Sequence, residues 1–272
     1  MRLLHVETGR HLYGGGRQVL YLLEGLAEQG IENHLVTTGG SELAQAARSL
    51  GVTVHELSCR GDLDALFGVR LLGLIRRIQP QLLHLHSRRG ADLWGGIAGY
   101  LSRTPVVLSR RVDNPEPAWL VALKYRLFDR VIAISGGIGQ VLVRQGLPER
   151  KLRVVHSALP VSTIAQQCRR SDFHRAFGLP AGAEVGAIIA QLIPRKGHAT
   201  LFAALPAVLA QRPRLHILCF GQGPLRDELQ NALRAEGLAD RVQLLGFRAD
   251  LPNWLACLDL IVHPARMEGL GV

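Results

Sequence analysis

Residues 185–211, VGAIIAQLIPRKGHATLFAALPAVLAQ, decide the fold. The apolar run over residues 185–191 predicts a buried strand, and residues 197–211 predict a helix. Only a short basic turn, Pro194-Arg195-Lys196-Gly197-His198, separates the two. A strand that leads through a short turn into a helix is the repeating unit of a parallel α/β sheet.

The same alternation runs through the rest of the chain. The sequence predicts further strands at residues 2–6, 34–38, 52–57, 82–86, 106–109, 131–134, 214–221, 241–245 and 258–263. It predicts further helices at residues 17–29, 41–50, 63–78, 92–101, 225–236 and 250–257. The rhythm breaks around residues 154–180, which indicates a passage between domains. We therefore expect two Rossmann-like, doubly wound α/β domains with parallel sheets, at residues 1–160 and 161–272.

Composition and charge narrow the class of protein. The chain has 272 residues, enough for two domains, and a formal net charge of +10 that favours an anionic partner. Aromatic residues make up only 5%, which is poor material for base stacking, so we expect no nucleic-acid partner. No apolar run reaches the roughly 18 residues of a membrane span, and the N-terminal run is too short for a signal peptide.

The cysteines are far apart in the sequence and form no CxxC pair; they are Cys59, Cys168, Cys219 and Cys257. This spacing suggests neither a zinc site nor a disulfide framework. We therefore expect a protein of the reducing cytoplasm.

A glycine-rich turn, Tyr13-Gly14-Gly15-Gly16, stands between the first predicted strand and the first predicted helix. Glycines let the backbone approach a ligand closely, and a helix N-terminus offers N–H groups to an anion. A tight turn without a ligand is an equally good interpretation of these residues alone. The spacing is not GxGxxG and no acidic ribose partner is evident, which disfavours an NAD-dependent enzyme.

Two turns of the second half carry further candidate residues. Arg195 and Lys196 stand at a helix start, where cations oppose the helix dipole unless they face a bound anion such as a diphosphate. The alternative is a solvated basic turn. Residues 264–271, PARMEGLG, follow the last predicted strand, and there Glu268 and the glycine N–H groups could meet sugar hydroxyls. A surface turn is the alternative interpretation of that stretch.

Taken in order, these motifs resemble the retaining GT-B glycosyltransferases of family four, over essentially the whole chain. Residues 190–198 resemble that family's donor-diphosphate loop, residues 221–225, GQGPL, its GxGP turn, and residues 241–247, RVQLLGF, its RVxFxG strand. Residues 264–271 resemble the start of its E-G-x-G-x4-E segment. The glycine-rich turn resembles its acceptor-side loop, and residues 131–135, VIAIS, its strand-and-serine segment.

The resemblance implies an activity and a set of site residues. The activity is retaining transfer of a sugar from a nucleotide-sugar donor to a glycan or lipid-linked acceptor, of the cell-envelope polysaccharide or lipopolysaccharide type. It uses no metal and no other cofactor. Lys196, helped by Arg195, would hold the donor diphosphate and stabilise the charge that develops on it. Glu268 and the backbone of Gly269, Leu270 and Gly271 would bind the transferred sugar, while Gly14, Gly15 and Gly16 would face the phosphate and the acceptor.

Three departures from the family pattern bear on function. Gln191 stands where many members have Arg, and Ser109-Arg110-Arg111 stands where many have His. A phosphate contact by Arg110 or Arg111 and a surface basic pair are equally good interpretations. The family's second Glu would fall beyond Val272.

That last departure predicts a C-terminally truncated chain with an incomplete second domain. Such a chain would expose apolar strand surface, dissolve poorly and have little activity of its own. A non-catalytic nucleotide- or glycan-binding fragment of the same fold is the alternative function.

Two other groups of residues look like metal ligands. Asp62-Leu63-Asp64 resembles a metal-binding DxD, but it does not follow a hydrophobic strand, so helix capping by Asp62 is the better interpretation. His84 and His86 lie on one face of a predicted strand. Because no third ligand is nearby in the sequence, we expect a cleft-lining or packed pair and no metal site.

Two predicted helical stretches, around residues 66–78 and 119–128, mix apolar with basic residues. Core packing with a solvated basic edge is one interpretation. Peripheral contact with an anionic membrane surface is the other, and it would place the protein on the inner face of the membrane.

Overall fold

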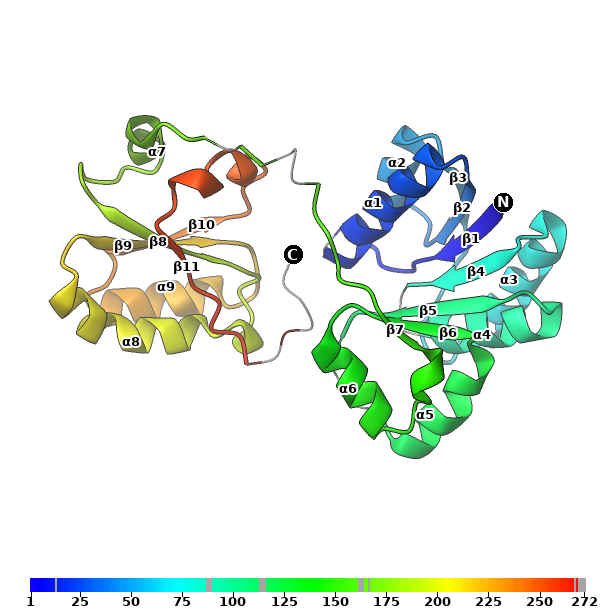
Figure 1. The fold of residues 1–272 in the computed structure, drawn as a ribbon. Coiled ribbons are helices and arrows are strands. Elements are labelled where there is room, and N and C mark those ends of the chain that lie inside the picture. Colours follow the sequence, from blue (N-terminus) through cyan, green and yellow to red (C-terminus); the bar gives the residue numbers. More distant parts are fainter. Residues whose placement is uncertain are drawn as a thin grey trace. The chain divides into compact units, whose positions relative to one another are not determined.

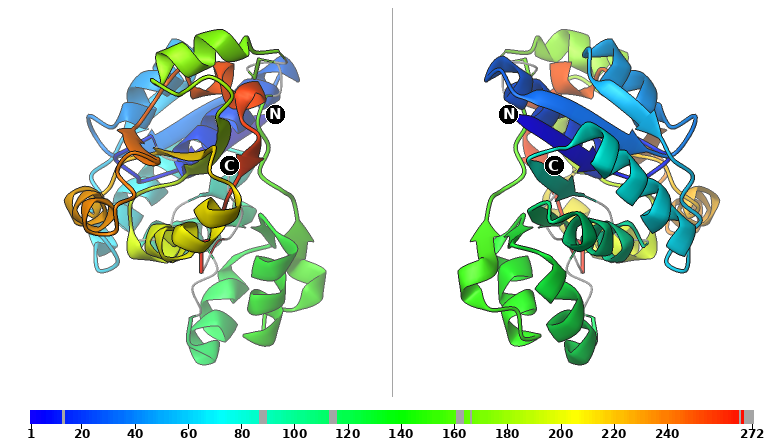
Figure 2. Two further views of the ribbon diagram at one scale, coloured as in Figure 1. Left: turned by 90° about the vertical axis from the view of Figure 1, so that its left-hand side faces the viewer. Right: turned by 90° about the vertical axis from the view of Figure 1, so that its right-hand side faces the viewer.

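The computed structural model describes residues 1–12, 14–86, 90–112, 116–160, 164–165, 167–266 and 268. The chain divides into two compact units, Met1–Leu159, to which Glu268 also belongs, and Pro160–Met267 (Figure 1). Each unit is built on a parallel β-sheet with helices on both faces (Figures 1 and 2). The predicted fold class is therefore confirmed.

The sheet of the first unit has seven strands in the order β3-β2-β1-β4-β5-β6-β7. These strands are β1 (Arg2–Val6), β2 (Glu32–Thr37), β3 (Thr53–Glu56), β4 (Leu82–Leu85), β5 (Val106–Arg110), β6 (Arg130–Ala133) and β7 (Leu152–Val154). The helices between them are α1 (Gly14–Glu28), α2 (Glu42–Ser49), α3 (Ala65–Ile78), α4 (Ala91–Ser102), α5 (Ala118–Lys124) and α6 (Gly136–Arg144).

Alternation along the strands builds two cores in this unit. Leu4 and Val6 of β1 face a large apolar cluster formed with α3, α4, α5 and α6. A smaller cluster on α1 and α2 includes Val19 and Leu23 of α1. His5 points to the face opposite Leu4, because successive side chains of a strand point to opposite faces. The polar side chains of β1 and β4 therefore lie on the α1 side of the sheet.

The second unit has four strands in the order β10-β9-β8-β11. They are β8 (Glu184–Ile189), β9 (Leu215–Phe220), β10 (Val242–Gly246) and the edge strand β11 (Leu260–Ile261). One face packs against α8 (His198–Gln211) and α9 (Arg226–Ala235), and the other against α7 (Arg170–Ala176) and the turns before β11. Leu260 and Ile261 are each 54% exposed, as expected for the apolar side chains of an uncovered edge.

Three expectations about local structure are wrong. Residues 250–257 form two 3₁₀ turns, Leu251–Asn253 and Leu255–Cys257, in place of one continuous helix. Asp64, and not Asp62, caps α3, because its Oδ1 accepts the Phe67 N–H at 3.0 Å. The sequence also failed to predict two helices. One is α7, which lies in the stretch predicted as a passage between domains. The other is α6, which begins with Gly136 and Gly137, both poor helix formers.

The cysteines also differ from expectation. Cys168 and Cys257 form a disulfide although they are 89 residues apart in the sequence, and their Cα atoms lie 5.5 Å apart. Both pack in the aromatic cluster around Phe173 and Trp254 on one face of the second sheet. Spacing along the chain could not reveal this proximity, because only the folded sheet brings the two segments together.

Candidate active site

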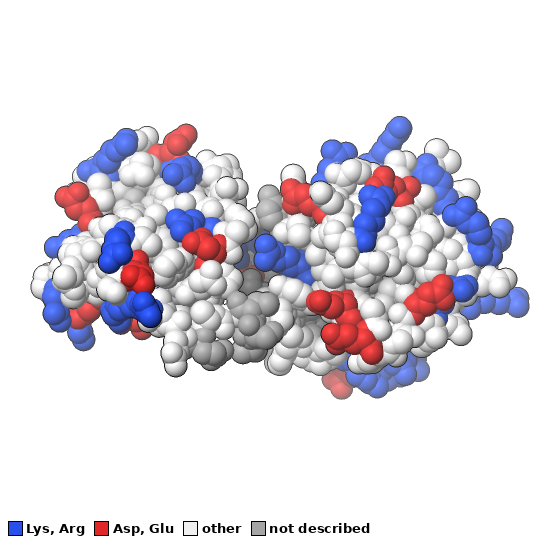
Figure 3. All heavy atoms as spheres, turned by 90° about the horizontal axis from the view of Figure 1, so that it is seen from above, with Lys and Arg blue, Asp and Glu red and all other residues white. Residues whose placement is uncertain are grey.

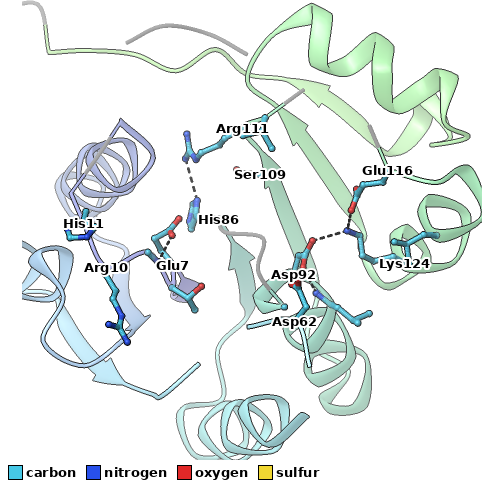
Figure 4. A pocket seen from close by; sticks show the side chains of 16 residues that line it. Glu7, Arg10, His11, Asp62, His86, Asp92, Ser109, Arg111, Glu116 and Lys124 are labelled. Atoms are coloured by element: carbon cyan, nitrogen blue, oxygen red, sulfur yellow. Dashed lines mark hydrogen bonds and ion pairs between the residues drawn. The ribbon is translucent and has the colours of Figure 1, made fainter. Parts of the chain in front are cut away.

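The first unit contains a cavity of about 810 Å³ where its strand order reverses. The sheet grows outward from β1 in one direction and from β4 in the other. The loops after these two strands diverge, and parallel α/β sheets bind ligands in the crevice that results. The segments after β1, β4 and β5 line the cavity with polar side chains, among them Glu7, His86 and Arg111 (Figure 4).

A buried ion-pair network forms the opposite wall (Figure 4). Lys124 Nζ lies 2.8 Å from Asp92 Oδ2 and 2.5 Å from Glu116 Oε1. Arg110 Nη1 lies 3.1 Å from Glu116 Oε2, which also accepts the Tyr125 hydroxyl at 3.1 Å. Two carboxylates and two cations thus balance one another, and each side chain is almost fully buried. Their function in the wall is to hold α4, β5 and α5 in fixed positions.

A chain of hydrogen bonds runs from the cavity into the core. Arg111 Nη2 lies 3.5 Å from His86 Nδ1, His86 Nε2 lies 3.1 Å from His5 Nδ1, and His5 Nε2 lies 3.2 Å from Asn33 Oδ1. Arginine can only donate, so Nδ1 of His86 accepts. With both rings neutral, His86 Nε2–H donates to His5, and His5 Nε2–H donates to Asn33. Asn33 Nδ2 in turn donates to the Ile31 and Leu23 carbonyls, which orients its amide.

Burial keeps these histidines neutral. It lowers the pKa of His5 to about 4, against a smaller raising effect of the Asn33 hydrogen bond. Burial also holds the pKa of His84 and of His86 well below the ordinary value, and the neighbouring histidines and Arg111 lower both further. His84 Nε2 lies 2.8 Å from Ser109 Oγ.

The fold supplies a third histidine that the sequence spacing did not suggest. His5 pairs with His84 in the β1–β4 register, and ring nitrogens of His5, His84 and His86 lie within 4.8 Å of one another. Three imidazoles could bind a transition metal. The hydrogen-bond chain already uses both nitrogens of His5 and of His86, His84 Nε2 bonds Ser109 Oγ, and the Arg111 guanidinium beside His86 opposes a second cation. The geometry therefore fits packed, hydrogen-bonded histidines better than a metal site, with His86 at the cavity.

Arg111 also borders the glycine-rich turn. Gly14, Gly15 and Gly16 form the first residues of α1, and a Cβ at Gly15 would lie 3.8 Å from Arg111 Cδ. Tyr13 lies outside the described residues. The interpretation of Arg110-Arg111 as a surface basic pair is wrong: Arg110 is 2% exposed within the ion-pair network, and Arg111 lines the cavity.

In the second unit, three loops pack backbone to backbone at the carboxyl ends of β8, β9 and β11. A Cβ at Gly221 or Gly223 would collide with the carbonyls of Ala190 and Leu192. A Cβ at Gly197, whose φ is +77°, would collide with the carbonyl of Pro264. These contacts require glycine. They also bring together, at one edge of the sheet, the loops that the sequence analysis proposed for donor binding.

The candidate cations lie at this edge. Arg195 and Lys196 belong to a 3₁₀ turn, Pro194–Lys196, that leads directly into α8. The Arg266 N–H donates to the Arg195 carbonyl at 2.9 Å, which joins the turn to the loop before Glu268. Arg195 is exposed, Lys196 and Glu268 are half-buried, and Gly269, Leu270 and Gly271 lie outside the described residues.

Sequence reasoning missed most of the cavity wall. Glu7, Asp92, Glu116 and Lys124 line it, and none of them belongs to a motif that the sequence revealed. The only sequence signal that could have identified one of these residues was its position. Glu7 directly follows the first predicted strand, and a parallel sheet binds ligands at the carboxyl ends of its strands.

Comparison with known proteins defines the class. Residues 13–162 match the family model Glycosyltransferase Family 4, and residues 184–272 match Glycosyl transferases group 1. The chain is 30% identical over 234 residues to alpha-D-kanosaminyltransferase of Streptomyces kanamyceticus. The aligned region covers 83% of this chain and 56% of that protein. It is 25% identical over 277 residues to the lipopolysaccharide core biosynthesis glycosyltransferase LpsE of Rhizobium meliloti, covering 100% of this chain and 74% of that protein.

The solved structure of HepE from Anabaena in complex with UDP has the same fold, with a TM-score of 0.82 at 19% identity, over 97% of this chain and 74% of that one. Two parallel α/β units with a cavity at the switch point define a GT-B protein. Since the first family model matches more than half of the chain, the protein belongs to glycosyltransferase family 4. The chain spans between about half and three quarters of the length of these relatives.

Proposed function

We propose that the protein transfers a sugar, with retention of anomeric configuration, from a nucleotide-sugar donor to a glycan or lipid-linked acceptor. Family membership supports the class of reaction. The packing of three loops around Lys196 at the carboxyl edge of the second sheet carries the proposal most directly, since it presents a cation at a helix start. The relatives support a nucleotide donor: HepE was solved with UDP, and LpsE acts in lipopolysaccharide core biosynthesis.

The donor would bind at this edge. Lys196 contacts the diphosphate, with Arg195 beside it, and their charge stabilises the leaving nucleoside diphosphate as the glycosidic bond breaks. Glu268 accepts hydrogen bonds from hydroxyls of the transferred sugar, and the backbone N–H groups of Gly269, Leu270 and Gly271 donate to them. No step of this scheme needs a metal ion, because the two cations supply the charge.

The acceptor would bind in the cavity of the first unit. Its walls alternate carboxylates, cations and imidazole with a few apolar groups such as Leu93 and Leu120, a lining suited to sugar hydroxyls. Gly14, Gly15 and Gly16 border this cavity through Arg111. The cavity volume of about 810 Å³ accommodates one or two sugar rings.

A screen of nucleotide sugars tests the proposal. The full chain is incubated with UDP-, GDP-, ADP- and dTDP-sugars, and thermal stabilisation, release of nucleoside diphosphate and transfer to a lipid-linked glycan acceptor are measured. Stabilisation together with turnover by one donor class is expected. Binding without turnover would favour the alternative, a non-catalytic nucleotide- or glycan-binding protein of this fold, and absence of both would refute the proposal.

The exposed face of α5 favours an acceptor at a membrane surface. Leu120 and Lys124 line the cavity, while Trp119 and Leu123 of the same helix are 70% and 61% exposed. On the face drawn in Figure 3, acidic side chains lie between the basic ones. None of the described helices is long and apolar enough to cross a membrane. We propose that this face of α5 meets anionic lipid, which places the cavity next to a lipid-linked acceptor at the cytoplasmic face of the membrane.

A further inference from the structure

Arg110 and Arg111 are consecutive residues, but their guanidinium groups have different hydrogen-bond partners. The guanidinium of Arg110 is fully engaged: Nε donates to the Val112 carbonyl at 3.0 Å, and Nη1 pairs with the Glu116 carboxylate at 3.1 Å. Among the residues that the structure describes, the guanidinium of Arg111 has one long contact, 3.5 Å from Nη2 to His86 Nδ1. Its Nε is buried and has no hydrogen-bond partner within the part of the chain that the structure describes.

Arg111 is only half-buried and lines the cavity, but its Nε is a buried donor, and leaving such a donor without a partner is costly because its lost hydration is not replaced. The neighbouring groups do not replace it. His5, His84 and His86 are neutral; the hydrogen-bond chain that ends on Asn33 uses nitrogens of His5 and His86, and His84 Nε2 bonds Ser109 Oγ. Among acidic groups, Glu7 acts on Arg111 through its charge, and one Glu7 oxygen accepts the Gly9 N–H at 2.9 Å.

A second positive feature lies at the same place. Arg111 Cδ is adjacent to Gly15, in the first turn of α1, and that first turn contains no acidic residue. The N–H groups of a first helical turn have no partners within the helix, and the helix dipole makes that end positive. A guanidinium and a positive helix end repel one another unless an anion lies between them.

We propose that Arg111 binds a phosphate group in the cavity of the first unit, together with the N–H groups at the start of α1. Arg111 offers Nε and Nη as a planar fork to two phosphate oxygens. His86, His5 and Asn33 are positioning residues: their fixed tautomers hold a lone pair toward Arg111 and so orient the fork. The phosphate belongs either to the donor diphosphate or to a phosphorylated, lipid-linked acceptor, and only this choice of source rests on the proposed function.

Pyrophosphate is the probe for the site itself. Calorimetric titrations use the full chain carrying Lys196→Ala, so that the signal reports the first unit. Adding Arg111→Gln should weaken pyrophosphate binding by about tenfold or more, the scale of a charge-assisted contact. Arg144→Gln is the matched control, because Arg144 is exposed in the last turn of α6 and its loss changes the net charge equally. Arg111→Lys, which keeps the charge without the fork, should weaken binding by a smaller factor and serves if the Gln variant does not fold.

UDP distinguishes the two sources of phosphate. With Lys196 intact, an equal loss of UDP affinity in Arg111→Gln assigns the phosphate to the donor, whereas unchanged UDP affinity assigns it to the acceptor. Pyrophosphate affinity unaltered by both Arg111 variants would overturn the proposal, as would an equal loss in Arg144→Gln. If Arg111 binds pyrophosphate but no nucleotide sugar is turned over, the proposed function fails and the anion site remains.

Discussion

Lys124 Nζ lies 2.5 Å from Glu116 Oε1, and both side chains are only 5% exposed. This ion pair joins α5 to the segment before it and forms one wall of the candidate acceptor cavity. Its neighbour Asp92, 2.8 Å from the same Lys124 nitrogen, ties α4 into the network. The wall of the cavity is therefore held by charge inside the protein, where each partner depends on the others.

Lys124→Met should destabilise the fold strongly. It leaves the buried carboxylates of Asp92 and Glu116 without their shared cation, and breaking a buried pair in this way costs about 3–5 kcal/mol. Urea denaturation followed by circular dichroism measures the loss. Arg48→Met is the control, because its pair with Glu56 is largely exposed and should contribute less than about 1 kcal/mol. Equal effects of the two substitutions would contradict the importance of the buried network.

Lys196→Ala should weaken binding of the nucleoside diphosphate by roughly 1–3 kcal/mol, since it removes one charge-assisted hydrogen bond. Isothermal titration calorimetry with the diphosphate of the preferred donor measures this. Arg234→Ala, at an exposed position on α9, should leave the affinity unchanged. Unchanged affinity in the Lys196 variant would exclude the role proposed for this residue.

The stability of the protein should fall as the pH drops from about 6.5 to 4. Burial lowers the pKa of His5 in the folded protein to about 4, while the unfolded chain has the ordinary value near 6.5. In this window the unfolded state binds a proton that the folded state does not, so acid favours unfolding. His5 alone should account for about 3 kcal/mol by pH 4, and His84 and His86 act in the same direction.

Chemical denaturation at a series of pH values tests this prediction. His5→Leu should be less stable at pH 7, because Asn33 and His86 lose a partner, yet its stability should depend less on pH. The exposed His156 provides the control, and His156→Gln should keep the slope of the wild type. A His5→Leu variant with the wild-type slope would show that this histidine does not control the acid sensitivity.

Vesicle binding should depend on the exposed face of α5. The double substitution Trp119→Ser and Leu123→Ser removes two exposed apolar side chains one helical turn apart, and it should lower co-sedimentation with phosphatidylglycerol vesicles severalfold. Binding should also rise with anionic lipid content and fall with salt. Tyr100→Ser is the control, because Tyr100 is 71% exposed and lies on another helix, α4. Equal pelleting with neutral and anionic vesicles would exclude an electrostatic contact.

The sequence by itself determined the architecture. Strand-and-helix alternation is local information, since burial of one face imposes a period on each segment, and residues 185–211 show this period clearly. Gly197, Gly221 and Gly223 belong to stretches that the family resemblance singled out, and the structure gives the reason for glycine there: a Cβ would collide with a neighbouring carbonyl. Hence the doubly wound fold and the family could be predicted, while the donor role of these loops stays a prediction.

Only the tertiary structure decided how distant residues meet. It brought His5 beside His84 and His86, and it joined Cys168 to Cys257. It also gave the neighbours Arg110 and Arg111 different partners. Each of these relationships depends on sheet register or on packing between segments far apart in the chain. The period of a single segment does not contain that information, because the order of strands in the sheet is set by the burial of all of them together.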